Sequence, residues 1–257
     1  MKGRENAKKG QMKMLALLTL LVTTSVSASE TAFDIFTNYS PSVVLIQTKN
    51  NGSGSGFFVT PSLILTNRHV VRSFSKKKRS WDYPTVIVLK DGNQITKFNS
   101  ILCSQRVDVC AISVAPETSI KTFSKLTTIA SKVGQDVFVV GHPQGILNPV
   151  ISSGIVSSEA ILIPSFDHQG KSTTFKGFTT TAAISPGSSG SPVLNKSGEI
   201  LGIAVSIIQG AQNLNLIIGS EELSLFAKQI TKRDGKAIFT VEPESKSTSL
   251  FNLISLQ

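Results

Sequence analysis

The sequence predicts an all-β protein, a barrel or sandwich of many short strands, with one helix near its C-terminal end. Short runs of β-branched and aromatic residues recur from residue 43 to residue 218, separated by polar or glycine-bearing turns. Only one segment, 221–230, has apolar residues at helical spacing. The 257 residues are 40% hydrophobic and 16% charged, which suits one long domain or two small barrels packed as one unit.

The first 28 residues have the pattern of a secretory signal peptide. A basic stretch up to Lys13 precedes an apolar run from Met14 to Val22, and Val26-Ser27-Ala28 offers small residues for cleavage after Ala28. A membrane anchor is the alternative, but the run is shorter than the roughly 20 residues that span a bilayer. Removing 1–28 takes away five Lys or Arg and one Glu, so the formal net charge falls from +10 to +6. We expect a periplasmic or secreted protein with no stable membrane insertion.

The predicted strands form two series. The first comprises 43–46, 56–59, 63–65, 86–89 and 109–114, and the second 136–140, 154–156, 178–181, 193–194 and 200–207. The Thr/Ser/Lys-rich stretch 116–133 is the natural connection between two barrels. We therefore expect one barrel over about 40–115, a second over about 134–220 and a helix over about 221–231, within a domain of residues 29–242. The tail, 243–257, is expected to be loosely ordered.

Two smaller features bear on compartment and partners. Cys103 and Cys110 flank a predicted turn, and an even cysteine count in an exported chain favours a disulfide bridge over two free thiols. The basic cluster 76–79 could meet nucleic acid, but no aromatic residues interleave with its charges, so we interpret it as a solvated loop. We expect no nucleic-acid partner.

Three separate segments could supply the groups of acyl transfer. Ser189 lies in Gly187-Ser188-Ser189-Gly190, where small residues let backbone N–H groups converge; such a sequence is also good linker composition. His69 follows an apolar strand, although a lone histidine is commonly a surface turn residue. Asp108 precedes the apolar run 109–114, and a buried carboxylate there requires a partner such as the imidazole of His69. We interpret the remaining histidines, His142 and His168, as structural.

Collinear motifs make this chain similar to trypsin-like serine endopeptidases, and in particular to the bacterial HtrA/Deg type. The similarity covers residues 42–230 and is carried by the following segments: Gly54-Ser55-Gly56-Phe57, Leu65-Thr66-Asn67-Arg68-His69-Val70, Asp108-Val109-Cys110-Ala111, Gly141-His142-Pro143 and Ser185-Pro186-Gly187-Ser188-Ser189-Gly190-Ser191-Pro192. The resemblance implies a chymotrypsin-like fold of two six-stranded antiparallel β-barrels, with the active site between them. It implies the catalytic residues His69, Asp108 and Ser189, and an oxyanion hole formed by the N–H groups of Gly187 and Ser189.

The chain departs from the family at several positions. Ser188 stands where the HtrA proteins carry Asn and where pancreatic zymogens carry the Asp that pairs with a freed N-terminus, and Ser191 replaces a Gly. Ala183 stands where pancreatic trypsins carry an acid, which argues against selection of Arg or Lys. We expect an apolar substrate pocket formed by Ile184, Ala204 and Leu216. Only 68 residues follow Ser189 in this sequence, so we expect no PDZ domain after the barrel and the helix.

The function that the sequence predicts is an exported serine endopeptidase that cleaves protein substrates after small or medium aliphatic residues. Such a mechanism requires no metal and no cofactor. The alternative is a catalytically silent relative that binds unfolded polypeptide or a protein partner. The departures at Ser188 and Ser191 leave that alternative open, because a misplaced N–H of Gly187 would remove one oxyanion donor.

Overall fold

The structure is a computed structural model that describes most of the chain. The described residues are 31–48, 52–71, 73–75, 80–82, 84–117, 120–123, 125–127, 130–166, 172–207, 213–234 and 240–241. The predicted signal peptide, the basic cluster 76–79, His168 and the tail 243–257 lie outside them.

The first sheet is antiparallel and contains seven strands in the order β7-β6-β1-β2-β3-β9-β8. Along the chain these are β1 (Val43–Thr48), β2 (Ser53–Thr60), β3 (Leu63–Thr66), β6 (Pro84–Val88), β7 (Gln94–Ile95), β8 (Ser100–Cys103) and β9 (Cys110–Ser113). The four-residue helix α3 (Arg68–Val71) follows β3, and β4 (Ser73–Ser75) and β5 (Ser80–Asp82) form a separate ribbon. The first four residues of β1 and six residues of β2 are buried, so this half of the sheet is covered on both faces.

The second sheet closes on itself. Its six barrel strands run in the order β14-β11-β12-β13-β16-β15, and β15 pairs back to β14. They are β11 (Asp136–Gly141), β12 (Val150–Phe166), β13 (Ser172–Thr180), β14 (Pro192–Leu194), β15 (Ile200–Ile207) and β16 (Asn215–Gly219). Two short strands, β10 (Lys125–Leu126) and β17 (Thr240–Val241), extend it beyond β15 in parallel pairings.

The predicted all-β class with two chymotrypsin-like sheets and a late helix is confirmed, with one difference in the first sheet. Among the described residues β7 pairs only with β6 and β8 only with β9, so this sheet is a half-barrel rather than a closed six-stranded barrel. Its edge strands are short, β7 having two residues and β8 four, so no ladder joins the two edges.

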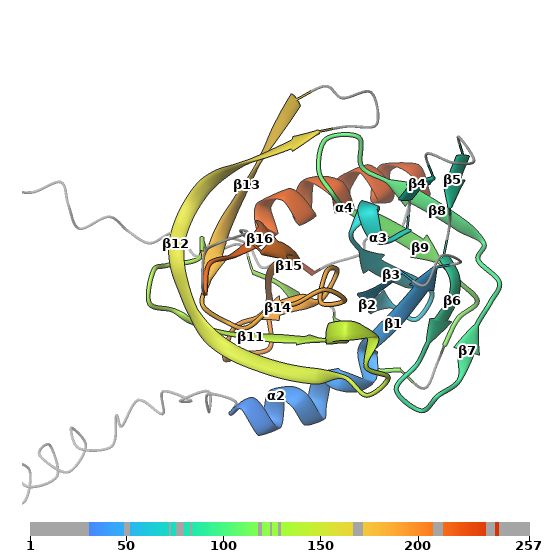
Figure 1. The fold of residues 1–257 in the computed structure, drawn as a ribbon, viewed down its shortest axis with the longest axis horizontal. Coiled ribbons are helices and arrows are strands. Elements are labelled where there is room, and N and C mark those ends of the chain that lie inside the picture. The colour runs from blue at the N-terminus through green and yellow to red at the C-terminus, as the bar shows by residue number, and fades with distance from the viewer. Residues whose placement is uncertain are drawn as a thin grey trace, which may run out of the picture.

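The helices flank the sheets. Helix α4 (Ser220–Asp234) confirms the predicted C-terminal helix and extends it, and Figure 1 shows it lying along one side of both sheets. Helix α2 (Ala32–Tyr39), which was not predicted from the sequence, begins with a capping box between Thr31 and Asp34. A 3-10 turn (Ser40–Ser42) joins α2 to β1, and another (Pro143–Gly145) follows β11. No helix in the described part of the chain is long and apolar enough to cross a membrane.

The largest hydrophobic cluster crosses from one sheet to the other. It joins Val43, Phe57 and Leu65 of the first sheet to Phe138 and Ile203 of the second. A second cluster lies within the half-barrel and a third within the closed barrel. The sheets therefore share one core, and the junction between them is fixed by packing.

Candidate active site

Strand register brings three distant segments of the chain to one place. In the first sheet Gly56 pairs with Thr66 and Thr66 pairs with Cys110, so β2, β3 and β9 are aligned at this row. His69 follows Thr66 by three residues and Asp108 precedes Cys110 by two. The N–H of Ser55, on β2, donates to the carbonyl of Ser189 at 2.7 Å, which attaches the Ser189 turn of the second sheet to this row.

His69 and Asp108 form a close pair. Nδ1 of His69 lies 2.5 Å from Oδ2 of Asp108, and the backbone N–H of His69 donates to Oδ1 at 3.0 Å. The Asp108 side chain is 14% exposed and the His69 side chain 49% exposed. Because a carboxylate only accepts hydrogen bonds, Nδ1 carries the proton and Nε2 is left to accept one. The predicted partnership of His69 and Asp108 is present in the structure.

The electrostatics of the pair favour a basic imidazole. Burial lowers the pKa of His69, but the charge of Asp108 and its hydrogen bond raise it, while Arg68 lowers it. The pKa of His69 is therefore raised above its ordinary value.

The segment before Ser189 is a type II β-turn. The N–H of Ser188 donates to the carbonyl of Ser185 at 2.9 Å, Pro186 occupies the second position, and Gly187 has a φ of 93°. A Cβ at Gly187 would lie 2.5 Å from the carbonyl oxygen of His142, so both conformation and space require glycine there. Among the described residues neither the N–H of Gly187 nor that of Ser189 has an acceptor.

Loop 142–145 and Ser55 hold this turn in place. The carbonyl of Pro186 accepts from the N–H of Gln144 at 2.6 Å. The hydroxyl of Ser55 donates to the carbonyl of Gly187 at 2.8 Å and accepts from the N–H of His142 at 2.9 Å. The carbonyl of Pro186 shares a trans peptide with the N–H of Gly187 and points the opposite way, so its hydrogen bond to Gln144 fixes the orientation of this N–H.

The hydroxyl of Ser189 does not contact His69 in this structure. It donates to the carbonyl of Val205, on β15, at 2.8 Å. The Ser189 turn is therefore attached through Ser55 to the strand row that precedes His69, while the Ser189 hydroxyl is directed at the second sheet.

The three predicted pocket residues do not surround one cavity. Ala204 is fully buried in the cluster inside the closed barrel, and Ile184 packs at the edge of that cluster. Leu216 packs against the cluster that the two sheets share. Of the three, only Ile184 lines the cavity of about 140 Å³ beside Ser185 and Ser188. Their role in substrate selection stays a prediction.

The Asp108 loop is closed at its base by a disulfide. Cys103 and Cys110 pair across β8 and β9 and are joined, as the sequence favoured. Within this loop the carbonyl of Asp108 accepts from the side-chain amide of Asn67 at 2.8 Å. The described residues contain no group of three histidine, cysteine or acidic residues that could hold a metal ion.

The trypsin-like peptidase domain family matches residues 54–203, a range that includes His69, Asp108 and Ser189. The chain belongs to this family. It is 34% identical to the HhoA protein of Synechocystis over 65% of this chain and 40% of HhoA. It is 27% identical to the serine protease PepD of Mycobacterium tuberculosis over 70% of this chain and 40% of PepD. A relative from Chlamydia pneumoniae, named as a DegP-like periplasmic endoprotease, is 29% identical over 74% of this chain and 36% of its own length.

Solved structures share the fold of this peptidase domain. The active form of the Rv3671c protease from M. tuberculosis matches with a TM-score of 0.66 at 22% identity, covering 76% of this chain and 83% of that one. Deg5 matches with a TM-score of 0.60 at 26% identity, covering 75% and 90%. The chain spans about two fifths of the length of HhoA and PepD.

Four residues of the site were missed from the sequence. Ser55 was noted only as part of a motif, and His142 was set aside as structural, yet together they fix the Gly187 turn. Asn67 and Val205 contribute a side-chain amide and a backbone carbonyl. Because His142 and Val205 contribute only backbone groups to these contacts, their residue types could not have pointed to them. The place of Ser55 between two glycines was the one available signal.

Proposed function

We propose that this peptidase domain is a serine endopeptidase with Ser189 as nucleophile, His69 as base and Asp108 as the orienting acid. The observation that carries the proposal is the 2.5 Å contact between His69 and Asp108, at the same junction to which Ser55 attaches the Ser189 turn. The N–H groups of Gly187 and Ser189, which have no acceptor in the part of the chain that the structure describes, support an oxyanion hole there.

The proposed reaction proceeds through an acyl-enzyme. Oγ of Ser189 attacks the substrate carbonyl carbon as its proton passes to Nε2 of His69, and the oxyanion receives hydrogen bonds from the two N–H groups. The imidazolium then gives the proton to the leaving amine as the C–N bond breaks. A water molecule, deprotonated by the same imidazole, releases the acid product and frees Ser189.

Attack requires Ser189 to exchange one hydrogen bond for another. Its hydroxyl must leave the carbonyl of Val205 and donate to His69. A neutral hydrogen bond is worth about 1 kcal/mol net, so a side-chain rotation of this kind is accessible when substrate arrives.

We further propose a preference for a small or medium aliphatic residue before the scissile bond. Ala183 is uncharged and stands where an acidic residue would select Arg or Lys in the substrate. Ile184 lines the small cavity beside the Ser189 turn. Cleavage of a peptide library should yield products ending in such residues. Products ending in Arg, Lys or Glu would refute the preference.

Export is proposed on the pattern of residues 1–28 and on the Chlamydia relative that is named periplasmic. In this setting the substrates would be proteins or peptides outside the cytoplasm. Sequencing the N-terminus of the protein purified from the periplasm or medium should give Ser29 as the first residue.

A silent, polypeptide-binding relative remains the second candidate function. The observation that favours it is that the hydroxyl of Ser189 donates a hydrogen bond to the carbonyl of Val205 instead of to His69. In that case the Ser189 region would bind a polypeptide chain without cleaving it.

Active-site labelling with a fluorophosphonate probe separates the two functions. The wild-type protein should be labelled and cleave casein, whereas Ser189→Ala should do neither. Ser191→Ala is the matched control, because Ser191 is fully buried two residues away and its hydroxyl has no partner among the described residues. Absence of labelling in a folded wild-type protein would reject the enzyme, and labelling that survives Ser189→Ala would reject the nucleophile.

A further inference from the structure

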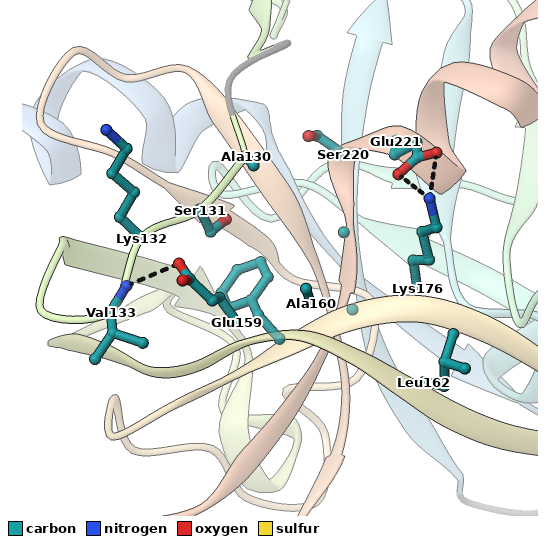
Figure 2. Close-up of a pocket in the computed structure, with 13 residues that line it drawn as sticks. Ala130, Ser131, Lys132, Val133, Glu159, Ala160, Leu162, Lys176, Ser220 and Glu221 are labelled. Atoms are coloured by element: carbon teal, nitrogen blue, oxygen red, sulfur yellow. Dashed lines mark hydrogen bonds and ion pairs between the residues drawn. The ribbon is translucent and has the colours of Figure 1, made fainter. Parts of the chain in front are cut away.

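A large groove lies on the closed barrel, apart from the proposed active site. Its volume is about 690 Å³, and none of its lining residues is His69, Asp108 or Ser189. Figure 2 shows Ala130 and Ser131 on one side of the groove, Ser220 and Glu221 on the other, and Leu162 on the ribbon below Lys176.

The rims of the groove are held by polar contacts. A bulge in β12 puts Ala160 at a φ of 53°, a strained conformation for a residue with a side chain. Beside it, the carboxylate of Glu159 accepts from the N–H of Val133 at 3.2 Å. On the opposite rim, Nζ of Lys176 lies 3.0 Å from a carboxylate oxygen of Glu221 (Figure 2). These contacts hold both rims in place, so the groove is a defined feature of the folded structure.

The groove leaves apolar side chains in water. Leu162 is 66% exposed and Val133 is 59% exposed, and both line it. Gly177 and Gly219 add bare backbone to the lining. Covering apolar surface of this kind with an apolar partner removes it from water, which is favourable.

We propose that residues 250–256 of this same chain dock in the groove. The segment is Leu-Phe-Asn-Leu-Ile-Ser-Leu, with large apolar side chains at Leu250, Phe251, Leu253, Ile254 and Leu256 and no charge. Its uncharged, apolar composition matches the apolar lining between the two polar rims. One rim is held by the Lys176–Glu221 ion pair and the other by the hydrogen bond from Val133 to Glu159. It is the one segment beyond residue 241 with a run of apolar residues.

The direction of the chain carries the tail toward the groove. Strand β17 runs parallel to β10, with Val241 opposite Leu126. From Leu126 the chain proceeds to 130–133, which form one wall of the groove. A tail leaving Val241 in the same direction therefore starts toward that wall.

The length of the tail is sufficient. Seven residues separate Leu126 from Val133, and at about 3.3 Å per residue they extend at most about 23 Å. Nine residues separate Val241 from Leu250, and they can extend about 30 Å. The apolar segment thus reaches the groove without any movement of β17.

Hydrogen exchange on the full chain tests the docking. All proteins carry Ser189→Ala so that the tail is not cut. Amides of 250–256 should exchange slowly, and the groove variant Leu162→Asp should speed them at least about tenfold. Leu253→Asp in the tail should in turn speed exchange at 130–133 and 176–178.

Two further variants keep the result interpretable. Gly219→Leu should fill the groove and also release the tail. A Cβ at Gly219 would lie 3.5 Å from its nearest neighbour, the carbonyl oxygen of Lys176, which is an ordinary contact. Phe33→Asp is the matched control, because Phe33 is 76% exposed and does not line the groove; it should leave the tail protected. Equal exchange of 250–256 in all variants would overturn the proposal.

A photo-crosslinker in place of Ser255 identifies the occupant. Crosslinks to 130–133 or 176–178 within one chain support docking of the chain's own tail. Dimer-sized products would assign the groove to a second copy, and crosslinks elsewhere would assign the tail to another surface; either result overturns the proposal. These readouts require no peptidase activity, so they stand apart from the test of catalysis.

Discussion

The hydroxyl of Ser55 joins two backbone groups beside the proposed nucleophile. It donates to the carbonyl of Gly187 and accepts from the N–H of His142, and Ser55 itself is fully buried. The carbonyl of Gly187 belongs to the peptide that follows the proposed oxyanion donor. Ser55 is thus a positioning residue for that donor.

Replacing Ser55 with Ala should lower kcat about tenfold while KM changes little. The variant leaves two buried backbone groups unpaired, each of which costs about 1–3 kcal/mol, and it frees the turn to reorient. Steady-state kinetics on a peptide substrate measures the split. Ser42→Ala is the control, because its buried hydroxyl also donates to a carbonyl, that of Lys121, away from Gly187. An equal loss of kcat in both variants would contradict positioning.

The pairing of His69 with Asp108 sets the pH dependence of the proposed reaction. As a base His69 must be neutral, and its pKa is raised by Asp108, so kcat/KM should fall on the acid side with a midpoint above the ordinary histidine value. Asp108→Asn removes the charge, so the acid limb should move to lower pH while the rate falls by about 10⁴. A pH–rate profile of both proteins checks this. A limb that stays in place would show that another group titrates.

At the scale of elements, the loop that carries Asp108 is attached to helix α4. Arg106, two residues before Asp108, forms a two-point ion pair with Glu222 of α4, which also accepts from the N–H of Lys176 at 2.9 Å. The Glu222 side chain is 2% exposed, whereas that of Arg106 is 47% exposed. One buried carboxylate therefore links the first sheet, the second sheet and the helix.

Glu222→Ala should lower the free energy of unfolding by about 2 kcal/mol. Breaking a buried pair costs about 3–5 kcal/mol, and the half-exposed Arg106 recovers part of that by hydration. Glu221→Ala is the matched control, because its pair with Lys176 is well exposed on both sides and should contribute less than about 1 kcal/mol. Urea unfolding measures both. Equal losses would show that burial of Glu222 is not what matters.

The disulfide stabilises the same loop from its other end. Cys103 and Cys110 are seven residues apart, and a loop of that length is worth about 2 kcal/mol in the chain-entropy account. Replacing both cysteines with serine should lower the unfolding free energy by that amount. Urea unfolding of oxidised and variant protein provides the measurement. A variant as stable as the wild type would show that the hairpin of β8 and β9 closes without the bridge.

Sequence periodicity predicted the strands and the helix whose residues are buried in a regular pattern. It did not predict features that depend on contacts between segments far apart in the sequence. Strands β1, β2, β3 and β11 were expected because their apolar residues form continuous buried runs, and helix α4 was expected because its apolar residues recur at helical spacing. Helix α2 was missed because only Ile35 within it is buried, so its apolar face gives a weak signal. The triad could be proposed from motifs. The hydrogen bond from Ser189 to Val205 could not be predicted, because its acceptor is a backbone carbonyl, which every residue has.

At the scale of the whole molecule, the connection between the sheets is part of the core. Phe123 is 2% exposed and packs edge-on against Phe57 of β2 and stacks on Tyr39 at the end of α2. Its N–H donates to the carbonyl of Phe58 at 2.8 Å. Gly198, in the turn between β14 and β15, lies against the Tyr39 ring. The segment predicted as a linker thus joins both sheets and α2.

Because the core is continuous, the two sheets should unfold together. Phe123→Ala should cost about 3–5 kcal/mol, the range for a large aromatic removed from a packed interior. Urea unfolding followed by far-UV circular dichroism and by the fluorescence of the single tryptophan should give one coincident transition, shifted as a whole in the variant. Phe33→Ala, at a position 76% exposed, should leave the transition unchanged. Two separate transitions in the wild type, with only one moved by Phe123→Ala, would show that the half-barrel and the closed barrel fold independently.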